Sequence, residues 1–237
     1  MGEQVGLDVP GIGEVGGWLA RPLGEPRGGL VVVQEIFGVN GHMRAVADAY
    51  AAEGYLALAP AFFDPVESGV ELGYGEDGFR RGRELASRLG VERAVAIVEA
   101  AAARLRQSLP GGSDDAPRIG AVGFCWGGTV AYLANTRLGL PAVSYYGART
   151  VPFLEEPLRA PMLFHFGARD HSIPAADVDA HRAHLPGAAI HVYDAGHGFN
   201  RDVDPRHHDA ASAALAHART LAFLADALGA GAPPDRS

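Results

Sequence analysis

Three side chains that could cooperate in covalent catalysis each follow a strand-like segment. Cys125 lies in the sequence GFCWG, Asp170 in FGARD and His197 in DAGHGF. A cysteine thiolate can attack a carbonyl carbon, and a histidine can remove the thiol proton near neutral pH. A carboxylate can then hold the imidazole in the required orientation. The three residues together predict a nucleophile, a base and an orienting acid.

Glycines on both sides of Cys125 indicate a tight turn between a strand and a helix. This is the G-x-S-x-G nucleophile elbow with cysteine in place of serine, and the glycines relieve crowding around the strained nucleophile. The turn also puts Cys125 at a helix amino terminus, where the helix dipole favours the thiolate. The alternative is a buried, inert cysteine, which leaves the flanking glycines without a cause.

Asp170 and His197 are individually ambiguous. Asp170 could cap the helix expected to begin near Pro174, and His197 alone could be a surface histidine. Together with Cys125 they are informative, because the order cysteine, aspartate, histidine at three strand ends is the order of α/β-hydrolase triads. We therefore predict that Cys125, Asp170 and His197 form a triad.

Glu35 is an acid at the end of an apolar run. A carboxylate there is costly to bury unless an arginine, a hydroxyl, a backbone amide or the Cys125 thiol pairs with it. A salt-bridged carboxylate at a strand edge is the alternative. In hydrolases of this kind, one N–H of the oxyanion hole follows the nucleophile and another comes from an early loop. We expect the backbone N–H groups of Ile36 and Trp126 to fill these roles.

The chain has 237 residues, and all 20 of its lysine-plus-arginine positions are arginine. The sequence therefore excludes mechanisms that need a Schiff-base lysine or a P-loop lysine. Its net charge of -8 and the lack of a basic stripe argue against nucleic-acid binding. One cysteine excludes an internal disulfide and a cysteine-based zinc cage.

The remaining composition favours a cytoplasmic enzyme that acts on small molecules. No apolar run reaches the ~18 residues of a membrane span, and the first ten residues do not resemble a signal peptide. His181 and His184, with Asp177, lie on one expected helix face but match no zinc signature. We expect no metal and no cofactor.

Strand-like and helix-like segments alternate along the chain, which predicts an α/β fold with a doubly wound, mostly parallel sheet and helices on both faces. We expect one domain over residues 1–228 and a flexible tail over 229–237. Expected strands cover residues 30–36, 55–59, 118–124, 142–146, 162–166 and 190–193, with a possible antiparallel edge strand at 15–19. Expected helices cover residues 43–53, 79–108 with a break near Gly90, 126–136, 175–184 and 209–228.

Five segments together resemble the dienelactone hydrolase (carboxymethylenebutenolidase) family, whose members have the α/β-hydrolase fold. These segments read QEIFGVN from residue 34, GFCWGG from 123, AVSYYG from 142, GARD from 167 and AGHGFNR from 195. The resemblance implies the triad of Cys125, His197 and Asp170. Two departures affect the expected pocket: Gly198 follows the histidine where well-known members have serine, and Trp126 replaces a smaller apolar residue.

The resemblance also implies roles for residues outside the triad. Glu35 is expected to contact the cysteine in the resting enzyme and to move when substrate binds. Arg201 and a second arginine, Arg81 or its neighbour Arg80, are expected to bind a substrate carboxylate, for which the bidentate guanidinium is suited. Tyr145 is expected near the site.

The predicted reaction is hydrolysis of a small lactone or enol ester that carries a carboxylate, through a thioester on Cys125. The enzyme is expected to be a monomer or a weak dimer. Alternatives are a generic carboxylesterase or peptide hydrolase on the same scaffold and a non-hydrolytic thiol sensor. A glutamine-amidotransferase-like fold also carries cysteine on an elbow, but it does not explain the order of Asp170 and His197.

Overall fold

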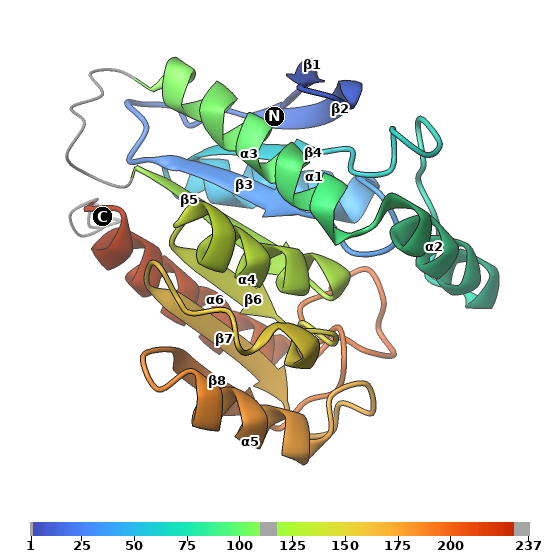
Figure 1. Ribbon diagram of the computed structural model, residues 1–237, viewed down its shortest axis with the longest axis vertical. Coiled ribbons are helices and arrows are strands. Elements are labelled where there is room, and N and C mark those ends of the chain that lie inside the picture. The colour runs from blue at the N-terminus through green and yellow to red at the C-terminus, as the bar shows by residue number, and fades with distance from the viewer. Residues whose placement is uncertain (1, 110–117, 230–237) are drawn as a thin grey trace.

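The structure is a computed structural model that describes residues 2–109 and 118–229. Apart from Gly229, the tail predicted at 229–237 lies outside the described residues. Eight strands form one sheet: β1 (Glu3–Val9), β2 (Gly13–Ala20), β3 (Gly29–Val33), β4 (Leu56–Pro60), β5 (Ile119–Phe124), β6 (Ala142–Tyr145), β7 (Met162–Gly167) and β8 (Ala189–Tyr193). Their order is β1-β2-β4-β3-β5-β6-β7-β8 (Figure 1). The six strands from β3 to β8 are parallel, which confirms the predicted mostly parallel sheet.

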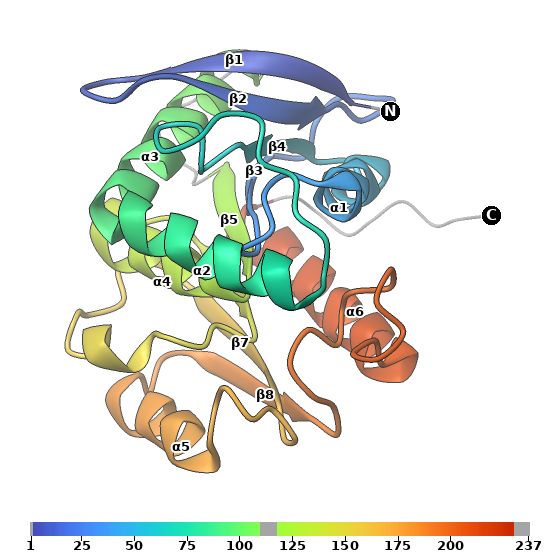
Figure 2. The same cartoon turned by 90° about the vertical axis from the view of Figure 1, so that its right-hand side faces the viewer.

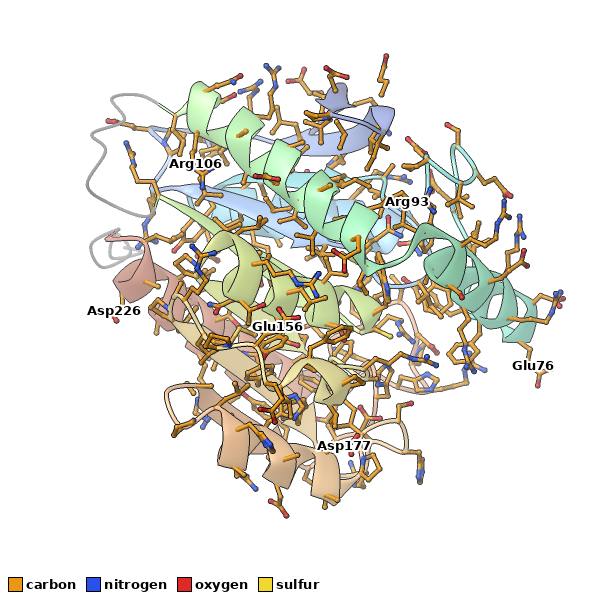
Figure 3. All side chains as sticks on the ribbon, in the orientation of Figure 1. Glu76, Arg93, Arg106, Glu156, Asp177 and Asp226 are labelled. Atoms are coloured by element: carbon orange, nitrogen blue, oxygen red, sulfur yellow. The ribbon has the colours of Figure 1, made fainter. Side chains whose placement is uncertain are left out.

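Helices cover both faces of this sheet. They are α1 (Gly41–Ala52), α2 (Glu76–Leu89), α3 (Val91–Ser108), α4 (Trp126–Leu138), α5 (Ala175–His184) and α6 (Ala210–Ala227), with a short 3-10 helix η1 (Val151–Phe153). Helices α3, α4 and α5 lie on one face and α1 and α6 on the other (Figures 1 and 2). Charged side chains such as Glu76 and Asp226 point outward from α2 and α6 (Figure 3).

Local sequence signals explain where several helices begin and end. Asn40 caps α1, and its side-chain oxygen accepts a hydrogen bond from the N–H of Met43 at 3.2 Å. Gly90 has φ +77°, so it separates α2 from α3 at the predicted break. Asp209 caps α6 by accepting from the N–H of Ser212 at 2.8 Å. Within the described residues, no helix has the length and apolar character needed to cross a membrane.

The amino-terminal strands differ from the prediction. The segment predicted as an edge strand is β2, but it lies between β1 and β4 and is antiparallel to both. The true edge strand, β1, was not predicted, because its residues are mostly exposed and only Leu7 and Val9 are buried. The hairpin between them turns at Gly11, which has φ +75°.

Strand β3 ends at Val33, earlier than the expected end at Ile36. Gln34, Glu35 and Ile36 therefore form a loop at the carboxyl end of the sheet. Gln34 ties this loop to the segment after β4, because its side-chain oxygen accepts a hydrogen bond from the N–H of Phe62 at 3.2 Å. Ligands of open α/β sheets bind at this end, and the candidate residues collect there.

Candidate active site

Cys125 lies on a sharp turn between β5 and α4. Its φ is +54°, a backbone conformation that residues other than glycine rarely adopt. A side chain at Gly123 would collide with the carbonyl oxygen of Gly127, and one at Gly127 with the carbonyl oxygen of Gln34. Both glycines are therefore needed for the backbone to pass this turn. The turn sets the thiol at the amino terminus of α4, as the elbow motif predicts.

The structure brings the three predicted triad residues into one hydrogen-bonded chain. His197 Nε2 lies 3.1 Å from Cys125 Sγ, and His197 Nδ1 lies 2.8 Å from Asp170 Oδ2. The other oxygen of Asp170 accepts from the N–H of Ser172 at 2.8 Å, which fixes the carboxylate in the loop after β7. Asp170 is buried, and the His197 side chain is 20% exposed, so substrate can reach the ring.

The surroundings of His197 favour its protonated form. Burial alone lowers the pKa of His197, but the charge of Cys125 and hydrogen bonds to Asp170 and Cys125 outweigh burial and raise this pKa to about 10. The geometry therefore favours an imidazolium between Asp170 and Cys125. A histidine in this position can accept and return a proton during acyl transfer.

The two backbone N–H groups that the sequence predicts for an oxyanion hole have no hydrogen-bond acceptor among the described residues. Trp126 is the first residue of α4, so its N–H has no acceptor within the helix. The N–H of Ile36, in the loop after β3, makes no hydrogen bond with the other described residues. Helix α2 supports this loop, because Gly82 lies directly against the carbonyl oxygen of Ile36 and a larger residue would collide with it. Figure 2 shows α2 in front of this end of the sheet.

Glu35 and Arg201 form a buried ion pair beside the cysteine loop. The Nε of Arg201 donates to Oε2 of Glu35 at 3.0 Å, and Nη2 donates to Oε1 at 2.8 Å. The two side chains are 1% and 6% exposed. The rings of Tyr74 and Phe37 lie 4.6 Å and 5.3 Å from the guanidinium carbon. Burial lowers the pKa of Arg201, but the Glu35 charge and hydrogen bonds more than reverse this and raise it.

This pairing differs from the contact implied by the family resemblance. Glu35 was expected to touch Cys125 in the resting enzyme, and the structure instead gives its carboxylate to Arg201. Arginine was among the partners that the sequence allowed. The hydrogen bond described for the Cys125 thiol is made with His197.

Two further predicted site residues, Arg81 and Tyr145, contact side chains outside the triad. Arg81 is on α2, next to Gly82, and its side chain pairs with Glu67 and Glu84. Tyr145 is buried at the end of β6, and its hydroxyl lies 2.7 Å from Thr220 of α6 rather than at the thiol.

Tyr146, which sequence reasoning missed, is the tyrosine that faces His197. Its ring centroid is 5.1 Å from the imidazole, its φ is +42°, and its side chain is fully buried. Its hydroxyl has no hydrogen-bond partner among the described residues. Burial raises the pKa of Tyr146 well above its usual value, and the Glu35 charge adds to this effect. Its phenol is therefore neutral. Side chains alternate between the two faces of a strand, so the sequence could place Tyr145 and Tyr146 on opposite faces. It could not show which of the two faces His197.

Aromatic rings pack against Trp126, the residue after Cys125. The ring centroids of Phe62 and Phe63 each lie 5.8 Å from that of Trp126, and all three side chains are buried. Trp126 thus packs into the segment after β4.

The histidine set on α5 does not form a metal site in the described residues. His181 Nδ1 lies 2.7 Å from the carbonyl oxygen of Asp177, which is an internal helix contact. No cluster of three or more potential metal ligands occurs in the part of the chain that the structure describes.

Comparisons with known proteins agree with this architecture. The sequence model of the "Dienelactone hydrolase family" matches residues 15–228. A carboxymethylenebutenolidase of Pseudomonas putida is 33% identical over 222 residues, which are 89% of this chain and 90% of the relative. A carboxymethylenebutenolidase of Pseudomonas sp. (strain P51) is 34% identical over 94% of both chains. The crystal structure of a candidate dienelactone hydrolase from Klebsiella pneumoniae superimposes with a TM-score of 0.79 at 30% identity, covering 95% of this chain and 99% of that one.

Proposed function

The chain belongs to the dienelactone hydrolase family, a family of ester-bond hydrolases with the α/β-hydrolase fold, and we propose that it hydrolyses small carboxylate-bearing lactones or enol esters with Cys125 as nucleophile. The observation that carries the proposal is the continuous chain of hydrogen bonds from Cys125 through His197 to Asp170. Each member ends a different strand–loop segment, so three separate parts of the fold converge on one thiol.

In the proposed reaction, His197 holds the proton that Cys125 loses. The thiolate attacks the carbonyl carbon, and the N–H groups of Ile36 and Trp126 stabilise the oxyanion. The carbon–oxygen bond of the ester then breaks. An enol ester releases an enolate, which is a good leaving group because its charge is delocalised. His197 then donates its proton to the released enolate.

A thioester on Cys125 remains after the first half of the reaction. His197 takes a proton from water, and the resulting hydroxide equivalent attacks the thioester carbonyl. The carbon–sulfur bond breaks, the acid is released, and the sulfur returns as thiolate or thiol. Asp170 stabilises the imidazolium during both halves.

The ion pair of Glu35 and Arg201 supports an anionic substrate. Arg201 already holds one carboxylate in bidentate geometry, and a substrate carboxylate presents the same two oxygens to the same two donors. In the proposal the substrate carboxylate displaces Glu35, which moves toward Cys125 and helps to remove its proton. Arg81 is the proposed second cation, at the end of the site nearest α2.

Turnover of cis- and trans-dienelactone by the Cys125→Ala and Cys125→Ser variants tests the nucleophile. We expect both variants to lose at least about a thousandfold in kcat/KM, since removal of one triad member has effects of this size. The chain has one cysteine, so wild-type enzyme treated with iodoacetamide should lose activity in step with labelling. Labelling at Cys125 with undiminished turnover, or an active Cys125→Ala variant, contradicts the proposal.

Wild-type enzyme should also form a thioester. Rapid quenching during dienelactone turnover should give a mass increase equal to the acyl group, and hydroxylamine should remove it. A protein that reacts with iodoacetamide but hydrolyses neither lactones nor simple esters would instead be a thiol sensor.

A further inference from the structure

Arg201 is held on two sides by carboxylates, one that is distant in sequence and one that is three residues away. Its Nε and Nη2 face Glu35, and its Nη1 donates to Oδ2 of Asp204 at 3.3 Å. We refer to Glu35, Arg201 and Asp204 as the charged cluster. The side chain of Asp204 is 4% exposed, so this carboxylate is as deeply buried as the arginine that it contacts.

Asp204 is itself fixed by surface residues of the same loop. Its Oδ1 accepts from Nε of Arg206 at 3.1 Å, and its Oδ2 lies 2.8 Å from Nδ1 of His207. The backbone N–H of Asp204 also donates to the carbonyl oxygen of Arg201 at 3.1 Å, which closes a tight turn between them. The position of this carboxylate is therefore determined without any contribution from Glu35.

Arg206 also contacts Tyr74, the residue whose aromatic ring packs against Arg201. Its Nη2 donates to the carbonyl oxygen of Tyr74 at 3.2 Å, while the Tyr74 ring lies 4.6 Å from the guanidinium carbon of Arg201. One exposed arginine thus connects the carboxylate on one side of the Arg201 guanidinium to the ring that packs against it.

The two carboxylates of the charged cluster therefore have different freedom. The Nε/Nη2 edge of Arg201 faces Glu35, which is anchored to Arg201 across 166 residues of sequence, and this is the edge that a bidentate ligand needs. The Nη1 edge faces Asp204, which belongs to the same turn and moves with it. An arginine that lost Glu35 would keep Asp204.

From this arrangement we infer that Asp204 is a positioning residue, which holds the Arg201 guanidinium in place when a substrate carboxylate replaces Glu35. This inference rests on the proposed function. A long arginine side chain loses considerable rotamer freedom when it binds an anion, and a side chain that is already fixed loses less. Asp204 is a negative charge near an anionic substrate, so its contribution must be geometric rather than attractive.

A matched pair of esters separates this role from a general effect on folding. The probes are mono-p-nitrophenyl glutarate, which ends in a carboxylate, and p-nitrophenyl pentanoate, which does not. For Asp204→Asn we expect KM for the glutarate to rise about tenfold while kcat and the pentanoate KM stay within about twofold, because only anion placement is disturbed. Asp204→Glu, which keeps the carboxylate, should restore most of the lost affinity.

The control variant is Asp202→Asn. It removes the same charge from the same loop, but Asp202 is 69% exposed and pairs with His42 instead of Arg201. We expect it to leave both KM values unchanged. If Asp204→Asn does not fold, Arg206→Gln serves instead. Arg206 is 70% exposed, and its replacement removes the contact with Oδ1 of Asp204. It should raise the glutarate KM in the same direction by a smaller factor.

Hydrogen exchange at the Nε–H of Arg201 tests the inference without any substrate. Asp204→Asn should speed this exchange about tenfold relative to wild type, because the side chain opens more often, and Asp202→Asn should not. Wild-type enzyme that hydrolyses the two esters with equal KM would refute the anionic substrate class, and the exchange rates would then decide the role of Asp204. Unchanged exchange in Asp204→Asn, or a lowered glutarate KM, overturns the inference.

Discussion

Two buried polar clusters of the molecule differ in charge. The charged cluster contains two carboxylates and a guanidinium. The second, which we call the neutral cluster, consists of Tyr145, His165, Tyr193 and Thr220 beneath α6. Thr220 Oγ1 lies 2.7 Å from the Tyr145 hydroxyl and 3.0 Å from His165 Nε2, and His165 Nδ1 lies 2.7 Å from the Tyr193 hydroxyl.

The neutral cluster links uncharged side chains to one another. A neutral imidazole offers one donor and one acceptor, which matches the two hydroxyls on either side of His165. Burial, with the nearby charges of His191 and Arg219, lowers the pKa of His165 to about 3, so the ring is uncharged at neutral pH. In our proposal, by contrast, a substrate carboxylate replaces Glu35 in the charged cluster. On that proposal, the charged side chains lie where a ligand exchanges, and the neutral side chains make contacts that do not change.

The largest expected effect is on the charged cluster. Arg201→Gln leaves Glu35 buried without its cation, and we expect a loss of about 3–5 kcal/mol in the free energy of unfolding. Urea denaturation at pH 7 measures it. Arg169→Gln is the control, because Arg169 is 61% exposed and pairs with Asp194 at the surface, where an ion pair contributes about 0–1 kcal/mol. Equal losses in the two variants would contradict the assignment of Arg201 as a buried partner.

A smaller effect is expected in the neutral cluster. Thr220→Val removes the hydroxyl that both Tyr145 and His165 contact, which should cost about 2 kcal/mol of stability because two buried polar groups lose a partner. Values of kcat/KM for the glutarate and pentanoate esters should not change. Thr220→Ser keeps the hydroxyl and should lose less than half as much. A substrate-dependent change in kcat/KM would show that the neutral cluster also takes part in binding.

The third effect depends on acid, and near neutral pH it is the smallest of the three. In the unfolded chain His165 has an ordinary pKa near ~6.5, whereas in the folded protein its pKa is about 3. Between these values the unfolded state binds a proton that the folded state does not. Stability therefore falls as pH falls from about 6.5 towards 3, with a slope that approaches about 1.4 kcal/mol per pH unit. Above pH 6.5 the contribution is constant.

Unfolding free energies measured at pH 7, 6 and 5 for wild type and His165→Gln test this dependence. The variant should show a shallower decline with falling pH, whatever its absolute stability. His171→Gln, at an exposed loop position, should decline like wild type. Identical slopes for His165→Gln and wild type would show that folding does not lower the pKa of His165.

The fold and the three triad positions could be predicted because their signals are local. A glycine-flanked cysteine, an acid and a histidine each follow an apolar strand, and parallel strands deliver their carboxyl ends to one edge. The predicted mostly parallel sheet is confirmed by the structure. The chemical roles of the triad remain predictions.

The rest depends on contacts that no local pattern records. The pairing of Glu35 with Arg201 joins residues that are 166 positions apart, and the sequence offered several partners for that carboxylate. Which of Tyr145 and Tyr146 faces His197 depends on the backbone conformation at the end of β6, where Tyr146 has φ +42°. Asp204 carries no motif. Its importance follows only from the burial and the donors that the fold gives it.

The distance in sequence between Glu35 and Arg201 also has a consequence for synthesis. The ribosome completes β3, β4 and β5 long before residue 201 emerges, and amino-terminal segments begin to fold first. Until then the nascent sheet has no Arg201 to neutralise the carboxylate at the end of β3, so that carboxylate must stay hydrated. The buried ion pair can therefore form only after the last sixth of the chain begins to emerge.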